Sequence, residues 1–305
     1  LYTFLSKVLL PFPFGSIFDH PKSMGLVNMM YYFSDEGRRL DKNVKILRGE
    51  VQKMIEAARV DPNLSKRRDI LSLFINDKAE FTDSELCDLI LHFIIAGRDT
   101  TACTLTWLFF ELTQNPDKQE KLAQEVQEKL PNGIEPTYEL VSPENMPYLN
   151  GCVYEALRLH PPVPEDWKVA SEDVTFPTGE TVPKGSQFIF SPYTMGRNPN
   201  LYPSPLTFKP ERWVPFKKPS SYEFPVFQAG YRECLGRDMA LFEAKLVTAS
   251  LIQRFAFTMK PEEARKVSYT LMLTMSLETR DPGTNKKSFN MWLRAHPRPG
   301  HPSIA

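Results

Sequence analysis

Apolar residues recur at helical spacing in several segments of this chain, and this pattern predicts helices there. The first 80 residues read as amphipathic helices. Thr82 and Glu85 then match a capping box, in which side chains satisfy unpaired backbone N–H groups at a helix start. A helix of about 30 residues should run from there to Asn115. It is apolar on nearly every side, which is typical of a helix that passes through a core; the residues are Leu89, Ile90, Phe93, Ile94, Ile95, Leu105, Trp107, Leu108, Phe109 and Phe110.

The second half of the chain mixes helical and strand patterns. A helix that contains Glu155 should end before the pair Pro161–Pro162. Alternating residues from Val174 to Phe190 flank a turn at residues 177–180 and predict a small antiparallel pairing. Helical spacing returns from Met239 to Phe257. The second half thus combines predicted helices with a small antiparallel β part.

Composition excludes several classes of protein. The 305 residues are 42% hydrophobic and 24% charged, which suits a globular domain. Lys+Arg and Asp+Glu are equal at 37 each, so no net field favours binding to nucleic acid. The four cysteines (Cys87, Cys103, Cys152 and Cys234) form no CxxC pair, which fits neither a zinc site nor a disulfide framework and favours a reducing compartment.

The first residues leave the relation to a membrane open. The segment from Leu1 to Gly15 is apolar apart from Lys7, so it could lie on a membrane surface, cap a substrate channel or belong to a core. An uninterrupted apolar run of about 18 residues is absent from the sequence, which predicts no membrane span. The chain begins without methionine or a signal-like segment, so we expect a fragment of a longer protein.

Cys234 is the strongest candidate for chemistry. It lies in the sequence FQAGYRECLG, directly before a predicted helix. A helix N-terminus stabilises a thiolate, which favours a metal-bound sulfur, although a free cysteine beside apolar residues can also be an inert core thiol. The pattern FxxGxRxCxG resembles the haem-binding loop of the cytochrome P-450 family. That resemblance implies haem b with Cys234 as the axial iron ligand, and cofactor contacts from the residues Ala96, Thr100, Phe227, Gly230, Arg232 and Gly236.

A polar block interrupts the long apolar helix at residues 96–101. A mid-helix threonine such as Thr100 often bonds back to the carbonyl four residues earlier, and this bends a helix without any chemistry. Alternatively, Thr100 opens a local groove that holds oxygen and a water. The block resembles the AGxDTT signature of the same family. That resemblance makes Asp99 a proton shuttle and makes Thr100 the residue that orders the proton-donating water.

A structural network is the third expectation. Glu155 and Arg158 share one helix face; such a pair is usually solvated, but here apolar neighbours favour burial. The segment Pro210–Trp213 could add Arg212, which resembles the ExxR and PERF/PERW couple of the family. This network would fix the loop that carries the thiolate.

The four motifs occur in the family's order, and the resemblance extends from about Asp69 to Arg298. It implies a mainly α fold with a small antiparallel β part, which is the C-terminal portion of a cytochrome P-450 fold in a single partial domain. The proline-rich stretch 198–225 would be the irregular meander of the family. Residues 1–80 would form a helical lid-like part and residues 81–305 the haem-binding core with a long central helix. The family's N-terminal anchor and first helices would be absent from this chain.

The resemblance also implies an activity. A haem-dependent monooxygenase would insert one oxygen atom of O2 into a hydrophobic substrate, because thiolate donation favours O–O cleavage. Electrons would come indirectly from NADPH through a flavoprotein reductase or a ferredoxin. The partner would dock through Lys217, Lys218 or Arg237, unless these side chains form only a solvated surface.

The substrate is predicted from the most similar branch, the eukaryotic fatty-acid and alkane hydroxylases. By position, Ile95, Ala96, Thr100, Val163, Leu273, Thr274 and Met275 would face the substrate, although each could be ordinary core. Sterol or xenobiotic oxidation is the second possibility within the class. A peroxygenase or isomerase, a haem-binding protein without turnover, and an inactive truncated product also stay open. Similarity to eukaryotic members implies the cytosolic face of the endoplasmic reticulum membrane.

Overall fold

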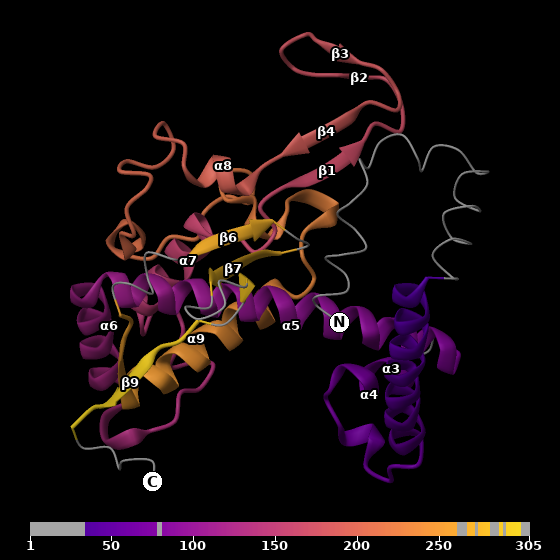
Figure 1. Ribbon diagram of the computed structural model, residues 1–305, viewed down its shortest axis with the longest axis horizontal. Helices are drawn as coiled ribbons and strands as arrows, with labels where there is room; N and C mark the ends of the chain where they lie inside the picture. The colour runs from indigo at the N-terminus through magenta and orange to yellow at the C-terminus, as the bar shows by residue number, and fades with distance from the viewer. Residues whose placement is uncertain are drawn as a thin grey trace. The chain divides into compact units, whose positions relative to one another are not determined.

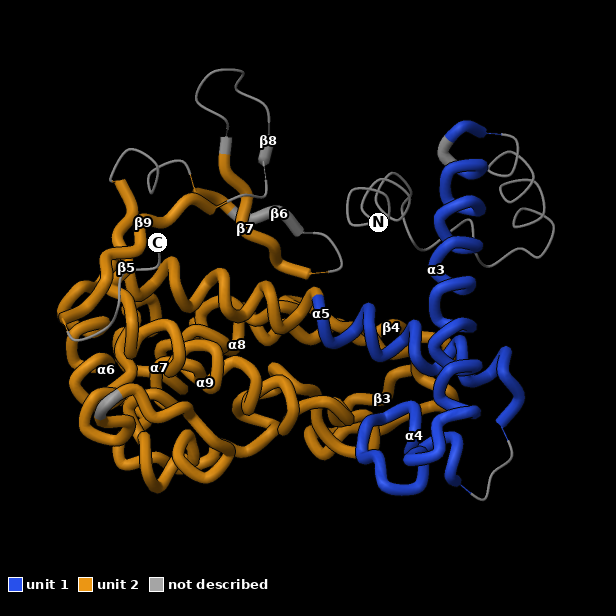
Figure 2. Tube along the Cα trace, turned by 90° about the horizontal axis from the view of Figure 1, so that it is seen from below, with its two compact units in different colours: residues 1–98 blue, residues 99–305 orange. Residues whose placement is uncertain are grey.

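The computed structural model describes residues 34–77, 81–260, 267–271, 274–280, 287–288 and 291–299. The chain divides into two compact units, Leu1–Arg98 and Asp99–Ala305, which are coloured separately in Figure 2. Among the described residues, no helix combines the length and the apolar character needed to cross a bilayer.

The described part of the first unit contains two helices and the start of a third. Helix α3 spans Asp35–Arg59, the 3-10 turn η1 spans Leu64–Lys66, helix α4 spans Ile70–Ile75, and helix α5 spans Asp83–Gln114 and continues into the second unit. Their apolar faces pack together, and the buried residues are Val51, Ile55, Ala58, Leu71, Leu86, Cys87 and Ile90. The described part of residues 1–80 is thus helical and shares a small core with the start of α5.

Helix α5 begins and ends where the sequence predicts. The Thr82 backbone N–H donates to Glu85 Oε2 at 2.8 Å, and the Glu85 N–H donates to Thr82 Oγ1 at 3.3 Å, so the capping box is confirmed. The 32 residues correspond to about 48 Å of helix. The prediction of burial along the whole helix is wrong at its centre, where Ile94 is 44% exposed. Burial is complete at Leu108 and Leu112, because these residues belong to the core of the second unit.

Besides the second half of α5, the described part of the second unit contains four helices. Helix α6 spans Pro116–Lys129, α7 spans Pro147–Leu159, α8 spans Pro192–Gly196 and α9 spans Arg237–Arg254 (Figure 1). Residues of α5, α6, α7 and α9 share one hydrophobic core. Every residue of α7 from Tyr148 to Leu159 is buried, so this helix lies in the middle of the unit.

Short antiparallel strands lie beside the helices (Figure 1). Strand β2 (Val174–Thr175) pairs with β3 (Thr181–Val182), which confirms the predicted pairing. Strand β4 (Gln187–Phe190) pairs with β1 (Asp166–Val169), which begins before the predicted range. The turn between β2 and β3 places Gly179 at φ +100°, a conformation that favours glycine.

The C-terminal strands correct one prediction. The helix expected to reach Phe257 ends at Arg254, and β5 (Phe255–Thr258) pairs with β9 (Arg294–Pro297). Strands β6 (Ser268–Leu271), β7 (Met275–Arg280) and β8 (Lys287–Ser288) form a further small sheet. An apolar run such as residues 255–257 fits a helix or a strand, and here the pairing with β9 decides between them.

The stretch 198–225 is irregular, as predicted. It contains the 3-10 turn η3 (Pro210–Trp213), and η2 (Pro131–Gly133) lies earlier in the chain. Two further turns, η4 (Pro225–Phe227) and η5 (Gly230–Arg232), lead into α9. These turns place the Cys234 segment directly before a helix start.

Candidate functional site

The loop that carries Cys234 reverses direction between η4 and α9. Gln228 has φ 66° and Gly230 has φ 68°, and both values lie in the left-handed region. The Cys234 backbone N–H donates to the Phe227 carbonyl at 2.8 Å and closes the loop. Gly236 is the N-cap residue of α9, so the sulfur lies one turn or less from the positive end of that helix.

Cys234 differs from the other three cysteines in exposure. Its thiol is exposed, whereas Cys87, Cys103 and Cys152 are buried. Burial raises the pKa of Cys103 to about 12 and raises that of Cys152 well above its usual value. Burial thus disfavours a thiolate at Cys103 and Cys152, and among the four cysteines Cys234 is the exposed one, which makes it the candidate metal-bound thiolate.

The surroundings of Cys234 fit a flat apolar group with acidic substituents. Tyr231 is fully exposed, Leu235 is 85% exposed and Met239 is 55% exposed, which is unusual for apolar residues grouped around one thiol. Arg232 is exposed two residues before the sulfur and carries the charge that a propionate requires. A Cβ built on Gly236 would come within 4.0 Å of Sγ, so glycine keeps the space beside the sulfur open. The residues present therefore fit haem b.

Glu155, Arg158 and Arg212 come together in a buried network. Glu155 and Arg158 are both 0% exposed, and Arg158 donates to the two carboxylate oxygens at 2.9 and 2.8 Å. Arg212 Nε adds a bond of 2.9 Å. The Trp213 indole N–H and the Lys209 backbone N–H each donate at 2.9 Å, so one carboxylate accepts five hydrogen bonds.

The two arginines of this network also hold the irregular stretch. Arg158 donates to the carbonyls of Gly196, Pro205 and Thr207. Arg212 donates to the carbonyls of Pro203 and Ser204 at 3.0 and 3.2 Å. Trp213 and Tyr154 pack against Phe224, which directly precedes the turn into the Cys234 loop. The network thus fixes the backbone that leads into the cysteine segment.

Sequence reasoning missed a second ionic cluster around Glu211. Its Oε1 accepts from Lys118 and Lys121 at 3.2 Å each and from the Tyr148 hydroxyl at 3.1 Å. Partial burial raises the pKa of Glu211, but its own backbone N–H, the two lysines and Tyr148 outweigh it and hold the pKa at about 2. Two features of the sequence could have indicated this cluster. Glu211 is the acidic residue of the PERW motif, and Lys118 and Lys121 lie on a helix that is rich in charged residues. Residue spacing alone does not pair side chains about 90 positions apart.

The polar block of α5 lies at the boundary of the two units. Asp99 and Thr100 are half-buried, and Thr104 Oγ1 donates to the Thr100 carbonyl at 2.9 Å. Thr101 Oγ1 is buried without a hydrogen-bond partner among the described residues. A threonine hydroxyl that donates to the carbonyl four residues earlier, as that of Thr104 does here, can bend a helix. The proton-transfer roles of Asp99 and Thr100 remain predictions.

The predicted substrate-facing residues divide between several places. Ile95 is half-buried and Ala96 is exposed in the first unit. In the second unit Val163 is half-buried, whereas Thr274 and Met275 are 2% and 0% exposed. Leu273 lies outside the described residues.

Met275 is held by α5 through its backbone. Its carbonyl accepts from Cys103 Sγ at 2.9 Å and from Trp107 Nε1 at 2.8 Å. Its N–H donates to the Pro162 carbonyl at 2.7 Å. The Met275 side chain packs with those of Cys103, Trp107 and Leu277. These contacts tie the start of β7 to the long helix and to the end of α7.

A mainly helical fold with one exposed cysteine at a helix start, supported by a buried Glu–Arg–Arg network, defines a candidate haem-thiolate protein. The chain belongs to the cytochrome P450 family, whose model matches residues 16–283.

Curated relatives and a solved structure agree with this family. The chain is 33% identical to "Cytochrome P450 CYP94D108" of Paris polyphylla, over 84% of this chain and 53% of the relative. It is 34% identical to "Cytochrome P450 86B1" of Arabidopsis thaliana (81% and 44%) and 30% identical to "Taurochenodeoxycholic 6 alpha-hydroxylase" of Sus scrofa (80% and 51%). A crystal structure of a cytochrome P450 (CYP102L1) superposes with a TM-score of 0.72 at 22% identity, covering 87% of this chain and 58% of that one, and supports the fold. The chain spans about half the length of the curated relatives it matches.

Proposed function

We propose that the protein containing this chain is a haem-dependent monooxygenase that inserts one oxygen atom of O2 into a hydrophobic substrate. The observation that carries the proposal is the exposed thiol of Cys234 at the start of α9, in a chain of the cytochrome P450 family. When bound, haem b supplies the oxygen-activating chemistry, with electrons from NADPH delivered by a flavoprotein reductase or a ferredoxin.

The residues of this chain would bind the cofactor and handle protons. The Cys234 thiolate would hold the iron and Arg232 would pair with a propionate, while Phe227, Gly230 and Gly236 shape the loop. Asp99 would transfer protons and Thr100 would order the water that delivers them. Ala96, which is exposed and has the smallest side chain after glycine, leaves room for a flat ring against α5.

The cofactor assignment is tested by the spectrum of the reduced protein with carbon monoxide. We expect the red-shifted Soret maximum that thiolate ligation produces, and we expect Cys234→Ser to abolish it. Cys103→Ser is the matched control, because that thiol is buried and bonded to the Met275 carbonyl. The cofactor assignment fails when the wild-type protein, loaded with haem, lacks the red-shifted maximum.

For the substrate we propose hydroxylation of a fatty acid or alkane. The candidate lining residues Ile95 and Val163 are apolar and only half-buried, which suits a hydrocarbon chain. Sterol or xenobiotic oxidation is the second candidate. The name of the pig relative, a taurochenodeoxycholic 6 alpha-hydroxylase, favours a steroid acid in that second class.

Titration separates the two substrate classes. Fatty acids of increasing length and a steroid acid are added to the ferric protein, and the change in the haem spectrum on binding is recorded. We expect a response that strengthens with chain length, since each methylene contributes about 1 to 3 kcal/mol in an apolar pocket. A response to the steroid acid alone would favour the second class.

A haem-binding protein without turnover, or an inactive truncated product, belongs to another functional class. NADPH consumption with product formation, measured with a reductase present, distinguishes a monooxygenase from both. Peroxide-driven turnover that survives Thr100→Ala would favour a peroxygenase instead, because that reaction does not need ordered proton delivery. Similarity to eukaryotic relatives supports a location on the cytosolic face of the endoplasmic reticulum membrane, with a membrane surface as a further partner.

A further inference from the structure

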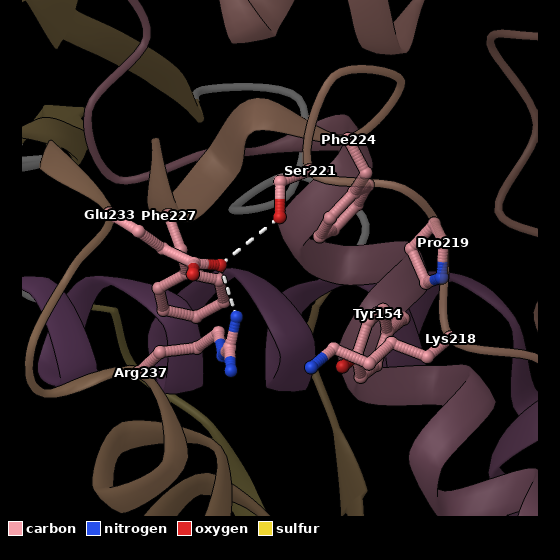
Figure 3. A pocket seen from close by; sticks show the side chains of 8 residues that line it. All are labelled: Tyr154, Lys218, Pro219, Ser221, Phe224, Phe227, Glu233 and Arg237. Atoms are coloured by element: carbon pink, nitrogen blue, oxygen red, sulfur yellow. Dashed lines mark hydrogen bonds and ion pairs between the residues drawn. The ribbon is translucent and has the colours of Figure 1, made fainter. Parts of the chain in front are cut away.

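Glu233, the residue before Cys234, is held from two sides. Ser221 Oγ donates to its Oε1 at 3.1 Å, and Arg237 Nη1 donates to the same oxygen (Figure 3). Ser221 belongs to the stretch that follows the Glu155 network, and Arg237 is the first residue of α9. One carboxylate therefore joins the incoming backbone, the cysteine loop and the helix start. We call the set Ser221, Glu233 and Arg237 the clamp.

The two charged residues of the clamp lie on either side of Cys234 in the sequence. Glu233 and Arg237 are four residues apart with Cys234 between them. The Cys234 backbone is also bonded on both sides, because its N–H donates to Phe227 and its carbonyl accepts from the Arg237 N–H at 3.4 Å. The thiol itself is exposed. This segment is therefore fixed by its backbone and by the Glu233 side chain, while the sulfur stays accessible.

The clamp lies in a partly enclosed site. The side chains of Arg237 and Glu233 are 21% and 34% exposed. They line a cavity of about 20 Å³, together with Tyr154, Lys218, Pro219, Ser221, Phe224 and Phe227 (Figure 3). Partial removal from water strengthens an ion pair compared with one on an open surface.

The clamp also carries two opposite charges, on the residue directly before Cys234 and on the residue three positions after it. A carboxylate next to a thiolate would repel it, and the Arg237 guanidinium balances that charge. The pKa of Arg237 is raised, first by its hydrogen bond to Asp238 and further by the charges of Asp238 and Glu233. Arg237 therefore stays charged at all relevant pH values.

We propose that Glu233 is a positioning residue, which acts with Ser221 and Arg237 to fix the sulfur of Cys234 and to balance the charge around it. The inference rests on the proposed haem-thiolate function, and it assigns a role to a carboxylate that the haem-loop pattern leaves unspecified. Charges and hydrogen bonds around a ligating sulfur change the reduction potential of the iron that it binds. The clamp should thus affect both the lifetime of the thiolate-bound form and that potential.

The experiment uses the whole haem-loaded protein at one pH and temperature. The first readout is the rate at which the reduced, carbon monoxide-bound protein loses its red-shifted Soret maximum. We expect Glu233→Ala to speed this loss about tenfold, the factor expected from one charge-assisted hydrogen bond. Glu233→Gln keeps an oxygen that accepts from Ser221 and Arg237, so it should restore much of the lifetime.

The second readout is the ferric–ferrous midpoint potential. If the clamp acted only through packing, the Glu233 and Arg237 variants would not shift this potential in opposite directions. Glu233→Gln removes a negative charge and should raise the potential, whereas Arg237→Gln removes a positive charge and should lower it. Glu223→Ala is the matched control, because that exposed glutamate lies on the same stretch outside the clamp. It should leave both readouts unchanged.

The possible results separate the two proposals. A wild-type protein without the red-shifted maximum overturns the proposed function. A wild-type protein with that maximum, whose Glu233→Ala variant keeps the wild-type lifetime, overturns the positioning role. Shifts of the potential in the same direction for Glu233→Gln and Arg237→Gln would overturn the charge balance.

Discussion

Replacing Glu155 by alanine removes the carboxylate on which five donors converge. Arg158 is 0% exposed and would remain charged without its counter-ion, a change that costs about 3 to 5 kcal/mol. The Trp213 indole N–H and the Lys209 N–H lose their acceptor as well, at about 1 to 3 kcal/mol each when unsatisfied. The total is comparable to the whole stability of a domain, about 5 to 15 kcal/mol. We expect Glu155→Ala to lose its fold and its haem together.

Urea unfolding measures this effect, with circular dichroism for the helices and visible absorbance for the haem. Glu155→Ala should lower the midpoint of both signals or leave no folded baseline. Glu128→Ala, at an exposed position of α6, is the control and should change stability by less than about 0.5 kcal/mol. Arg212→Ala should be milder than Glu155→Ala, because the carboxylate keeps Arg158. A midpoint for Glu155→Ala equal to that of Glu128→Ala would refute the structural role of the network.

Three further predictions concern acid stability, backbone packing and thiol reactivity. The folded pKa of Glu211 is about 2, below its usual 4.5, so its contribution to stability is present above about pH 4.5 and is lost as the pH falls toward 2. Acid titration of unfolding should therefore show a shallower loss in Glu211→Gln than in the wild-type protein, and an equal slope would contradict the pairing with Lys118 and Lys121. Gly151→Ala should destabilise the protein by more than about 1 kcal/mol, because the new Cβ would lie 2.7 Å from the Pro210 carbonyl oxygen; Gly49→Ala, with no atom within 4 Å, should be neutral or stabilising in thermal unfolding. Iodoacetamide should alkylate the haem-free protein at Cys234 before the three buried cysteines, as read by peptide mass spectrometry; equal labelling of Cys152 would contradict its burial.

Local signals in the sequence predicted local structure well. The capping box at Thr82 and Glu85 involves residues three positions apart, and the structure contains both of its backbone bonds. The end of α7 before Pro161 follows from the missing N–H and restricted backbone of proline. In each case the physical cause lies within one turn of the residues that signal it.

Features that depend on distant segments were not predictable in this way. The burial of Glu155 could be expected from its apolar neighbours, but the Trp213 indole as a donor comes from 58 positions away. The start of β5 at Phe255 depends on pairing with Pro297, which no local pattern specifies. The open centre of α5 was also missed, because an apolar helix surface does not indicate what packs against it. The clamp at Glu233 needed Ser221, which lies 12 positions earlier on an irregular stretch.

The two polar networks act on opposite ends of the cysteine segment, and this explains why a weakly regular loop can hold a reactive sulfur. The Glu155 network fixes the backbone before the loop through Trp213, which packs on Phe224. The clamp fixes the end of the loop against α9 through Arg237. Removing the first should unfold the unit, since Glu155 and Arg158 are fully buried and Arg212 is only 11% exposed. Removing the second should leave a folded protein with an altered iron environment, since its side chains are partly exposed. The difference in burial therefore predicts that stability depends on Glu155 and that the electronic properties of the sulfur depend on Glu233.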